Sequence, residues 1–361
     1  MPNILIAGGG SGGHVAPAIS VAEALLDKKC NAILAHSTRD VDSLMTKQTP
    51  FKCITVPASP LSLNPIGFVR FCNGFRKSEK VVSAFIKENG IDCVLSTGGF
   101  IAAPALRAAK KQSCPTVLLN LDNPPGKANR LAVRWADTVL STVECGLPSS
   151  KRIPPPLRKC VISSSNVTNS YEKFGLDPKL MTLLVTGASQ GATTINELVP
   201  ALAKLHPDQF RGWQILHVAG TGHSDTVKES WKDLNIPCNV TDFVDEMGLA
   251  WKIADLAITR GGANTIAELA INAVPAVILP YPYHKDDHQK TNAEKLASVG
   301  GVVVETDFIQ VSHNLDCAGN TILKLLKDHQ QRLIMRQAIA SLSTRNGSIA
   351  IADTCIASVR R

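Results

Sequence analysis

The stretch GGGSGGH at residues 8 to 14 places the strongest single constraint on how this chain can fold. It follows the apolar run Ile4 to Ala7, which has the length of a buried strand, and a segment with helical periodicity comes next. A strand, a glycine-rich turn and a helix in this order often bind a phosphate, because the amides and the positive dipole end of the helix attract anions. The chain is therefore expected to begin with a Rossmann-like unit.

Apolar segments of strand length alternate with helical segments along the whole chain. Strands are expected at 3–7, 31–35, 53–56, 92–96, 115–119 and 137–141, and again at 181–186, 214–218, 238–240, 255–259, 275–279 and 301–304. Between them we expect helices such as 15–28, 102–111, 192–205, 264–273 and 289–298. This alternation predicts an α/β protein whose parallel sheets are built from βαβ units.

Two domains are expected, because 361 residues exceed the usual size of one domain. The proline- and serine-rich segment 148–156 separates the two series of strands, and a second glycine turn, GASQG at 187–191, opens the second series. The simplest architecture is two facing Rossmann-like domains with a cleft between them. We expect the domains at 1–155 and 156–345, with the helix in 346–361 returning to the first domain.

Composition limits the class of protein. The ten cysteines form no CxxC pair, and no D-x-D motif stands at a strand end, so no metal is expected, and no other cofactor is expected unless the first glycine turn binds a dinucleotide. An excess of 38 basic over 30 acidic side chains suits anionic partners, whereas nucleic acid is not expected, because no basic and aromatic platform motif occurs. With neither a signal sequence nor a long apolar stretch, the expected location is cytoplasmic.

The first glycine turn has competing interpretations. Gly8, Gly10 and Gly13 satisfy the dinucleotide pattern G-x-G-x-x-G, but no carboxylate ends the second strand to hold the ribose of NAD. Arg39 keeps NADP, and therefore an NADP-dependent oxidoreductase, open. Alternatively, the glycines only allow the first helix to pack closely on the sheet.

The second half carries a fuller set of polar residues. In RGGANTIAE at 260–268 the glycines open a helix that suits a diphosphate, and Glu268 lies one turn after Asn264, where it could accept both hydroxyls of a ribose. The loop PYPYHKDDHQKTN at 280–292 can present Asp287, His288 and Gln289 to a sugar. The alternative is a solvated glutamate and an ordinary helix cap.

Six motifs together resemble the MurG glycosyltransferases, which add N-acetylglucosamine from UDP-N-acetylglucosamine to the undecaprenyl-diphospho-muramoyl-pentapeptide of cell-wall synthesis. They are GGGSGGH at 8–14, STGGFIAAP at 96–104, GASQGA at 187–192, VTDFVDEM at 240–247, RGGANTIAELA at 260–270 and HKDDHQKTNA at 284–293. The resemblance implies a GT-B fold with the donor in the C-terminal domain, the lipid acceptor at the N-terminal domain, and a peripheral position on the inner face of the plasma membrane.

The resemblance also implies roles for individual residues. The donor would be held by Arg158, Ser189, Gln190, the backbone of Val244, Ala263, Asn264, Thr265, Glu268 and Gln289. Ser11, Gly12 and Gly13 would face the donor sugar and the acceptor diphosphate, and Phe100 would line the same substrate site. The sequence departs from the family in two places. Asp122 stands where the family has an asparagine, and the nearest asparagine, Asn123, lies one residue later. The residues PPP at 154–156 replace the family's GNP before Arg158.

The implied reaction inverts the anomeric centre, and its base is expected to be His14, since a neutral imidazole can accept the proton of the attacking hydroxyl. Alternatively, His14 only binds the loop or the acceptor diphosphate. A non-catalytic nucleotide-sugar-binding protein, or a transferase with another lipid or small-metabolite acceptor, remains a second interpretation.

The segment 65–77 interleaves phenylalanines with cations and is expected to contact an anionic membrane surface. The contact residues would be Phe68, Arg70, Phe71, Phe75, Arg76 and Lys77. The alternative is that the phenylalanines belong to the core.

Overall fold

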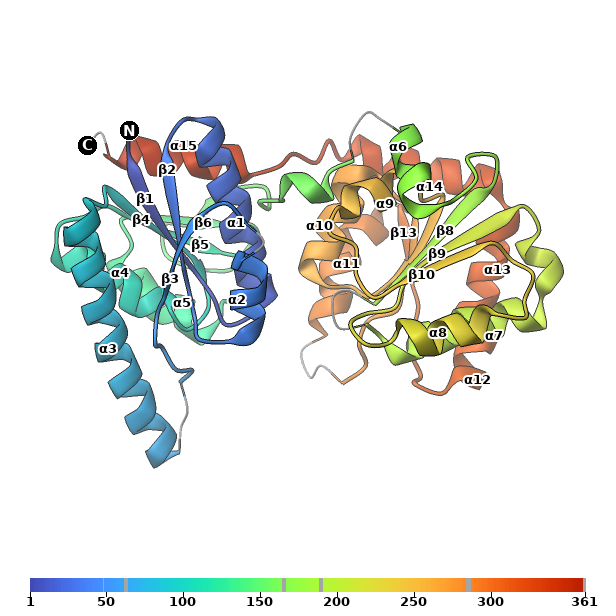
Figure 1. Ribbon diagram of the computed structural model, residues 1–361, viewed down its shortest axis with the longest axis horizontal. Coiled ribbons are helices and arrows are strands. Elements are labelled where there is room, and N and C mark those ends of the chain that lie inside the picture. The colour runs from blue at the N-terminus through green and yellow to red at the C-terminus, as the bar shows by residue number, and fades with distance from the viewer. Residues whose placement is uncertain (48, 62–63, 164–166, 188–190, 284–286, 360–361) are drawn as a thin grey trace. The chain divides into compact units, whose positions relative to one another are not determined.

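The computed structural model describes residues 1–47, 49–61, 64–163, 167–187, 191–283 and 287–359. The chain forms two compact units, Met1–Arg158 with Arg345–Arg361, and Lys159–Thr344 (Figure 1). Within the described residues, no helix combines the length and apolarity that crossing a membrane requires.

The first unit is built on a parallel sheet with the strand order β3-β2-β1-β4-β5-β6-β7. Its strands are β1 (Asn3–Gly8), β2 (Asn31–His36), β3 (Lys52–Thr55), β4 (Cys93–Gly98), β5 (Thr116–Asn120), β6 (Thr138–Ser141) and β7 (Lys151–Arg152). Its helices are α1 (Gly12–Asp27), α2 (Asp40–Lys47), α3 (Pro65–Asn89), α4 (Ala102–Lys111), α5 (Lys127–Ala132) and α15 (Ser348–Val359).

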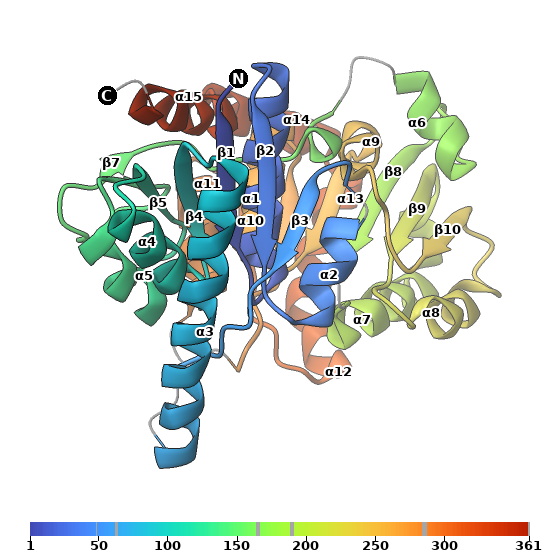
Figure 2. The same ribbon diagram turned by 60° about the vertical axis from the view of Figure 1, so that its left-hand side comes forward.

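Alternation along the strands buries both faces of this sheet. On β1, Ile4 and Ile6 belong to the core under α1 and α15, whereas Leu5 and Ala7 belong to the core under α3 and α4 (Figure 2). Because β1 lies between β2 and β4, the chain reverses its direction of winding there, and ligands of such sheets bind at the carboxyl ends of these strands. The glycine turns after β1 and β4 lie at this point.

The second unit repeats the plan with the strand order β10-β9-β8-β11-β12-β13. Its strands are β8 (Met181–Thr186), β9 (Trp213–Val218), β10 (Cys238–Thr241), β11 (Leu256–Thr259), β12 (Ala276–Ile278) and β13 (Val302–Val304). Its helices are α6 (Val167–Phe174), α7 (Thr193–Leu205), α8 (Ser224–Trp231), α9 (Met247–Ile253), α10 (Ala263–Asn272), α11 (His288–Ser298), α12 (Val311–Asn314), α13 (Asn320–Lys327) and α14 (His329–Ser341).

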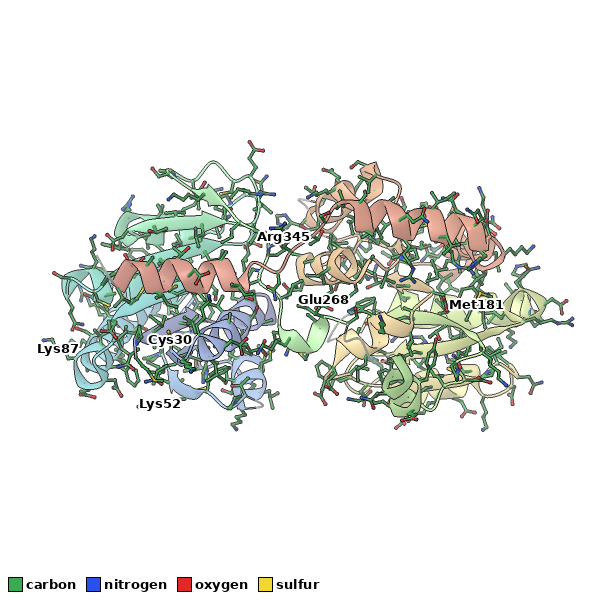
Figure 3. The ribbon with its side chains drawn as sticks, turned by 90° about the horizontal axis from the view of Figure 1, so that it is seen from above. Cys30, Lys52, Lys87, Met181, Glu268 and Arg345 are labelled. Atoms are coloured by element: carbon green, nitrogen blue, oxygen red, sulfur yellow. The ribbon has the colours of Figure 1, made fainter. Side chains whose placement is uncertain are left out.

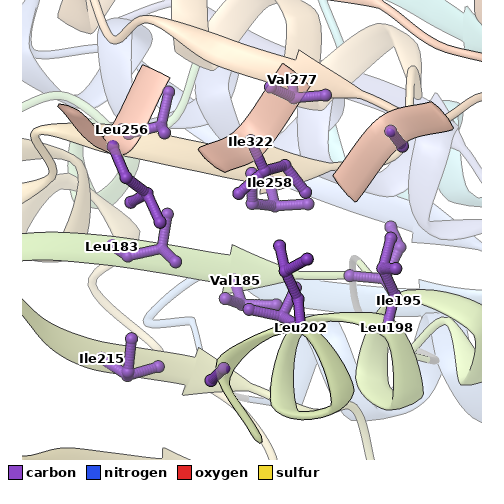
Figure 4. Close-up of a cluster of buried hydrophobic side chains, with 14 of the residues drawn as sticks. Leu183, Val185, Ile195, Leu198, Leu202, Ile215, Leu256, Ile258, Val277 and Ile322 are labelled. Carbon is purple, nitrogen blue, oxygen red and sulfur yellow. The ribbon is translucent and has the colours of Figure 1, made fainter. Parts of the chain in front are cut away.

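The core of the second unit forms in the same way. Leu183 and Val185 of β8 pack with Leu198 and Leu202 of α7 on one face of the sheet (Figure 4), whereas Leu184 belongs to the core on the other face. The winding reverses between β8 and β11, so the turns that follow these two strands mark the expected ligand edge.

Two details differ from, or add to, the expected elements. Helix α1 begins at Gly12, three residues before the expected start, because Ser11 is the extended N-cap residue and the last two glycines of the turn form the first helical turn. The helix α15 packs against α1, and the side chain of Asn346 before it binds both the N–H and the C=O of Leu157.

Candidate functional site

The first glycine turn is held by residues that follow β2. Arg39 donates from Nη1 to the carbonyl oxygen of Gly10 at 2.6 Å, and its guanidinium lies 5.3 Å from the centre of the half-buried Phe100 ring. Arg39, the cation that could have bound the 2′-phosphate of NADP, thus binds the glycine turn instead. Ser11 and Gly13 are exposed at the start of α1, and Gly12 is half-buried.

His14 lies in the first turn of α1 and is half-buried. Its Nδ1 is 3.1 Å from the carbonyl oxygen of Thr97 at the end of β4. A carbonyl only accepts, so Nδ1 carries the proton of the neutral ring and Nε2 holds the lone pair. The hydroxyl of Thr97 in turn donates to the carbonyl of His14 at 2.8 Å. The imidazole is therefore held in the tautomer that leaves Nε2 as its only proton acceptor.

The loop after β5 is supported by buried amides. Asn120 donates to the carbonyl oxygen of Asp122 at 2.8 Å, and Asn129 donates to Asn120 Oδ1 at 3.0 Å. The side chains of Asp122 and Asn123 are both exposed. Arg158 is half-buried and is the last residue of the first unit before the chain enters the second.

In the second unit, Gly261 brings the starts of α10 and α11 together. Gln289 Oε1 accepts from the N–H groups of Gly261 at 3.2 Å and Tyr281 at 2.9 Å, and Asn292 donates to the carbonyl of Gly261 at 3.0 Å. A Cβ on residue 261 would lie 2.2 Å from the carbonyl oxygen of Gln289, so only glycine permits this approach. Gln289 and the first turn of α10 are thereby placed side by side.

The first turn of α10 consists of the exposed Ala263 and the half-buried Asn264 and Thr265. One turn later lies the half-buried Glu268 (Figure 3). Its Oε2 accepts from the indole N–H of Trp251 at 2.8 Å. Trp251 lies on α9, which follows the buried Val244. The buried indole therefore fixes the orientation of the Glu268 carboxylate.

A buried ion pair lies beneath these turns. Arg260 donates from Nη1 to Asp307 Oδ2 at 2.6 Å and to the carbonyl of Leu279 at 2.9 Å, and from Nη2 to Thr194 Oγ1 at 2.7 Å. Burial raises the pKa of Asp307, but hydrogen bonds from Thr194, Asn314, the N–H of Ile309 and Arg260 outweigh it and hold that pKa below its ordinary value. The carboxylate thus stays charged and joins the ends of β11 and β12 to the start of α7.

The sequence predicted that Gln289, Glu268 and the first turn of α10 belong to one site, and all of them lie in the second unit. It missed the residues that hold them. No motif of the sequence marks Trp251 or Asp307. Asn292 lies within the loop 280–292, but nothing there distinguishes it. Ser189 and Gln190 fall outside the described residues. Among the residues that the structure does describe, no three His, Cys, Asp or Glu side chains gather where they could hold a metal ion.

The expected membrane segment forms the N-terminal half of α3, which extends beyond the sheet of its unit (Figure 1). Phe68 is 50% exposed and Phe71 is half-buried. The expected contact is wrong for Phe75, which is buried in the core beside Trp135 and beneath the Arg107 guanidinium. The basic residues Arg70, Arg76 and Lys77 are exposed.

Comparison with known proteins identifies the family to which this chain belongs. The Glycosyltransferase family 28 N-terminal domain matches residues 4–141 and the corresponding C-terminal domain matches residues 182–348. The chain is 34% identical to a UDP-N-acetylglucosamine–N-acetylmuramyl-(pentapeptide) pyrophosphoryl-undecaprenol N-acetylglucosamine transferase of Clavibacter michiganensis, over 97% of this chain and 94% of the relative. It is 32% identical to the protein of that name from Tropheryma whipplei, over 86% and 87%.

Among solved structures, the MurG of Acinetobacter baumannii matches with a TM-score of 0.75 and 23% identity, over 98% of this chain and 99% of that one. This likeness confirms the expected GT-B fold of two Rossmann-like domains with parallel sheets. Together with the sequence relatives, it shows that this chain belongs to the MurG family of glycosyltransferases.

Proposed function

We propose that this chain transfers N-acetylglucosamine from UDP-N-acetylglucosamine to the 4-hydroxyl of undecaprenyl-diphospho-muramoyl-pentapeptide, with inversion at the anomeric carbon. Membership of the family supports the reaction class. The donor assignment rests on one observation. The first turn of α10, Glu268 and Gln289 lie near the carboxyl ends of β11 and β12, where Trp251 orients Glu268, and the N–H groups of Gly261 and Tyr281 hold Gln289.

On the donor side, the amides of the first α10 turn, from Ala263 to Thr265, would take the diphosphate, and Glu268 would accept from the ribose hydroxyls. Gln289 already accepts two backbone N–H groups at Oε1, so its Nε2 is the atom that would donate to the sugar. The backbone of Val244 would meet the uracil. Arg158, Ser189 and Gln190 would lie near the diphosphate.

On the acceptor side, His14 would act as the base. As the muramoyl oxygen forms its bond to the anomeric carbon, its proton passes to Nε2 of His14, and the bond from that carbon to the diphosphate oxygen breaks to release UDP. Ser11, Gly12 and Gly13 would face the acceptor diphosphate, with Phe100, Asp122 and Asn123 beside the substrates. The Thr97 carbonyl supports this role because it keeps the proton on Nδ1.

Ligand binding tests the donor assignment first. Thermal unfolding is compared with UDP, UDP-N-acetylglucosamine, UDP-glucose and NADPH. A ligand at about 100 times its dissociation constant adds about 2.7 kcal/mol to stability. We expect UDP and its N-acetylglucosamine conjugate to stabilise the protein. Stabilisation by NADPH alone would refute the proposal, and a larger stabilisation by UDP-glucose than by UDP-N-acetylglucosamine would point to another donor sugar.

Turnover with the lipid acceptor tests the base. Replacing His14 by Ala should lower kcat about 100-fold or more, because positioned proton transfer contributes about that much. The exposed His313 on α12 provides a matched control, and His313→Ala should leave turnover unchanged. Turnover of His14→Ala within a few fold of the unaltered protein would remove His14 from the role of base and leave it as a binding residue.

We also propose that the N-terminal half of α3 binds an anionic membrane surface, which places the protein on the cytoplasmic face of the membrane, where its lipid acceptor lies. Ile66 and Val69 are 76% and 58% exposed and adjoin Phe68, and this apolar group is flanked by Arg70, Arg76 and Lys77. Charge reversal at the three cations should abolish binding to vesicles that contain anionic lipid. Unchanged binding would refute this contact.

A further inference from the structure

A buried carboxylate of unassigned role lies behind the first glycine turn. Asp42, in the first turn of α2, is fully buried, and its Oδ2 accepts from the N–H of Gly10 at 2.6 Å. The same oxygen accepts from the hydroxyl of Ser37 at 2.5 Å and from its N–H at 3.1 Å. The carboxylate therefore ties the turn after β1 to the residues that follow β2.

Gly10 is held on its other side as well. Its carbonyl accepts from Arg39 at 2.6 Å, and a Cβ on this residue would lie 2.5 Å from the Phe100 ring. Gly10 has a φ of +98°, a conformation that side-chain-bearing residues rarely adopt. Its N–H and its carbonyl are thus each held by a different side chain, and the Phe100 ring leaves no room for a Cβ, in a backbone conformation that glycine alone reaches easily.

The unpaired oxygen of Asp42 argues that this arrangement serves more than folding. Oδ1 is buried and has no hydrogen-bond partner among the described residues. A buried carboxylate oxygen without a hydrogen-bond partner costs stability, and an asparagine here could accept the same hydrogen bonds without burying a charge. Such costs are typical of functional sites, where local geometry is held at the expense of stability.

We propose that Asp42 and Arg39 are positioning residues that hold Gly10 from both sides, so that the first-turn amides of α1 face the diphosphate of the acceptor. This inference rests on the proposed function, because the acceptor diphosphate is the anion that the turn would bind. The first N–H groups of a helix have no partner within the helix, and their direction is set by the residue that leads into it. Neither positioning residue touches the substrate; both act through Gly10.

Kinetics with a short-chain prenyl-diphospho-muramoyl-pentapeptide acceptor test this role. Asp42→Ala should raise the KM for the acceptor at least tenfold and leave the KM for UDP-N-acetylglucosamine within twofold. Asp42→Asn retains an accepting oxygen and should restore the acceptor KM to within about threefold of the unaltered protein. A fall in kcat alone, with both KM values unchanged, is what loss of folded protein produces, and it would overturn the proposal.

Arg39 offers a variant that does not disturb the core, because it is exposed. Arg39→Met keeps an apolar chain over Phe100 but removes the donor to Gly10, and it should also raise the acceptor KM. The matched control is Lys52 (Figure 3), an exposed cation over the Phe85 ring at the amino end of β3, whereas the glycine turns follow the carboxyl ends of their strands. Equal acceptor KM values for Arg39→Met and Lys52→Met would overturn the role of Arg39.

Hydrogen exchange separates this inference from the proposed function. Peptides that cover residues 8–14 should exchange faster in Asp42→Ala and Arg39→Met than in the unaltered protein, whatever the acceptor. Unchanged exchange would overturn the proposal even if transfer is observed. Absence of transfer by the unaltered protein would instead reject the proposed function, while the exchange result still decides whether Asp42 and Arg39 hold the turn.

Discussion

The bond from Trp251 to Glu268 gives the sharpest test of the donor site. Trp251→Phe removes the indole N–H that donates to Oε2 at 2.8 Å and keeps an aromatic ring in its place. Glu268 would lose the indole hydrogen bond, which helps to orient its carboxylate. If Glu268 binds the ribose hydroxyls, UDP binding should weaken although the altered residue does not touch the nucleotide.

The size of the effect follows from the type of bond. A hydrogen bond to a charged group contributes about 1.5–3 kcal/mol, and 1.4 kcal/mol changes a dissociation constant tenfold. Because Glu268 can still reach the ribose from other orientations, the lower end applies. We expect the dissociation constant of UDP, measured by calorimetry, to rise about tenfold. Trp213→Phe, in an equally buried tryptophan on β9, should leave it within about twofold.

Binding of a nucleotide that lacks one ribose hydroxyl shows whether Trp251→Phe weakens UDP binding through the contact of Glu268 with the ribose. Removing the 2′-hydroxyl, as in 2′-deoxyuridine diphosphate, should weaken binding to the unaltered protein, because one donor to Glu268 is lost. In Trp251→Phe the same removal should cost clearly less, since changes in one hydrogen-bond network are not additive. Equal costs in the two proteins, or equal weakening by Trp213→Phe, would refute the role of Trp251.

Three further outcomes are expected. Asp307→Ala leaves the charge of Arg260 buried without its partner, so chemical denaturation should show a loss of about 3–5 kcal/mol; a loss below about 1 kcal/mol would contradict the buried ion pair. Burial lowers the pKa of His217 to about 3, so the free energy of unfolding should fall as the pH drops from about 6.5 towards that value, and His217→Phe should lack this fall over the same interval. Finally, the chelator EDTA should leave turnover unchanged if helix amides alone hold the leaving diphosphate; complete loss would show that a metal is required.

The fold could be predicted because its signals are local. Strands such as β8 and β11 are short, mostly apolar segments buried on both faces, and a glycine follows each within two residues, so their length and the glycine after them identify them. The start of α1 was misplaced because glycine usually argues against helix. Here Gly12 and Gly13 occupy the first turn, where an extended Ser11 leads the chain into the helix.

The site was predictable only in part, for a physical reason. Gln289 and Glu268 lie in motifs, and their spacing from the glycine turns is a property of the sequence. Trp251, Asp42 and Asp307 contact those motifs across 17, 32 and 47 residues of chain, and nothing near them in the sequence marks the partner. A tryptophan or an aspartate in a helix or loop has many ordinary uses, so only the folded structure shows which of them orient the site.

Two of these supporting residues, Asp42 and Asp307, also explain why the glycine turns can be rich in glycine. Glycine allows the backbone to approach a ligand, but it adds conformational freedom that blurs the positions of the amides. In each unit a buried carboxylate offsets that freedom: Asp42 fixes the turn after β1, and Asp307, through Arg260, fixes the ends of β11 and β12. Turn and carboxylate should therefore fail together, so a glycine substitution in either turn should reduce the additional effect of removing its carboxylate. Strictly additive effects in such double variants would show that the carboxylates support the sheet alone.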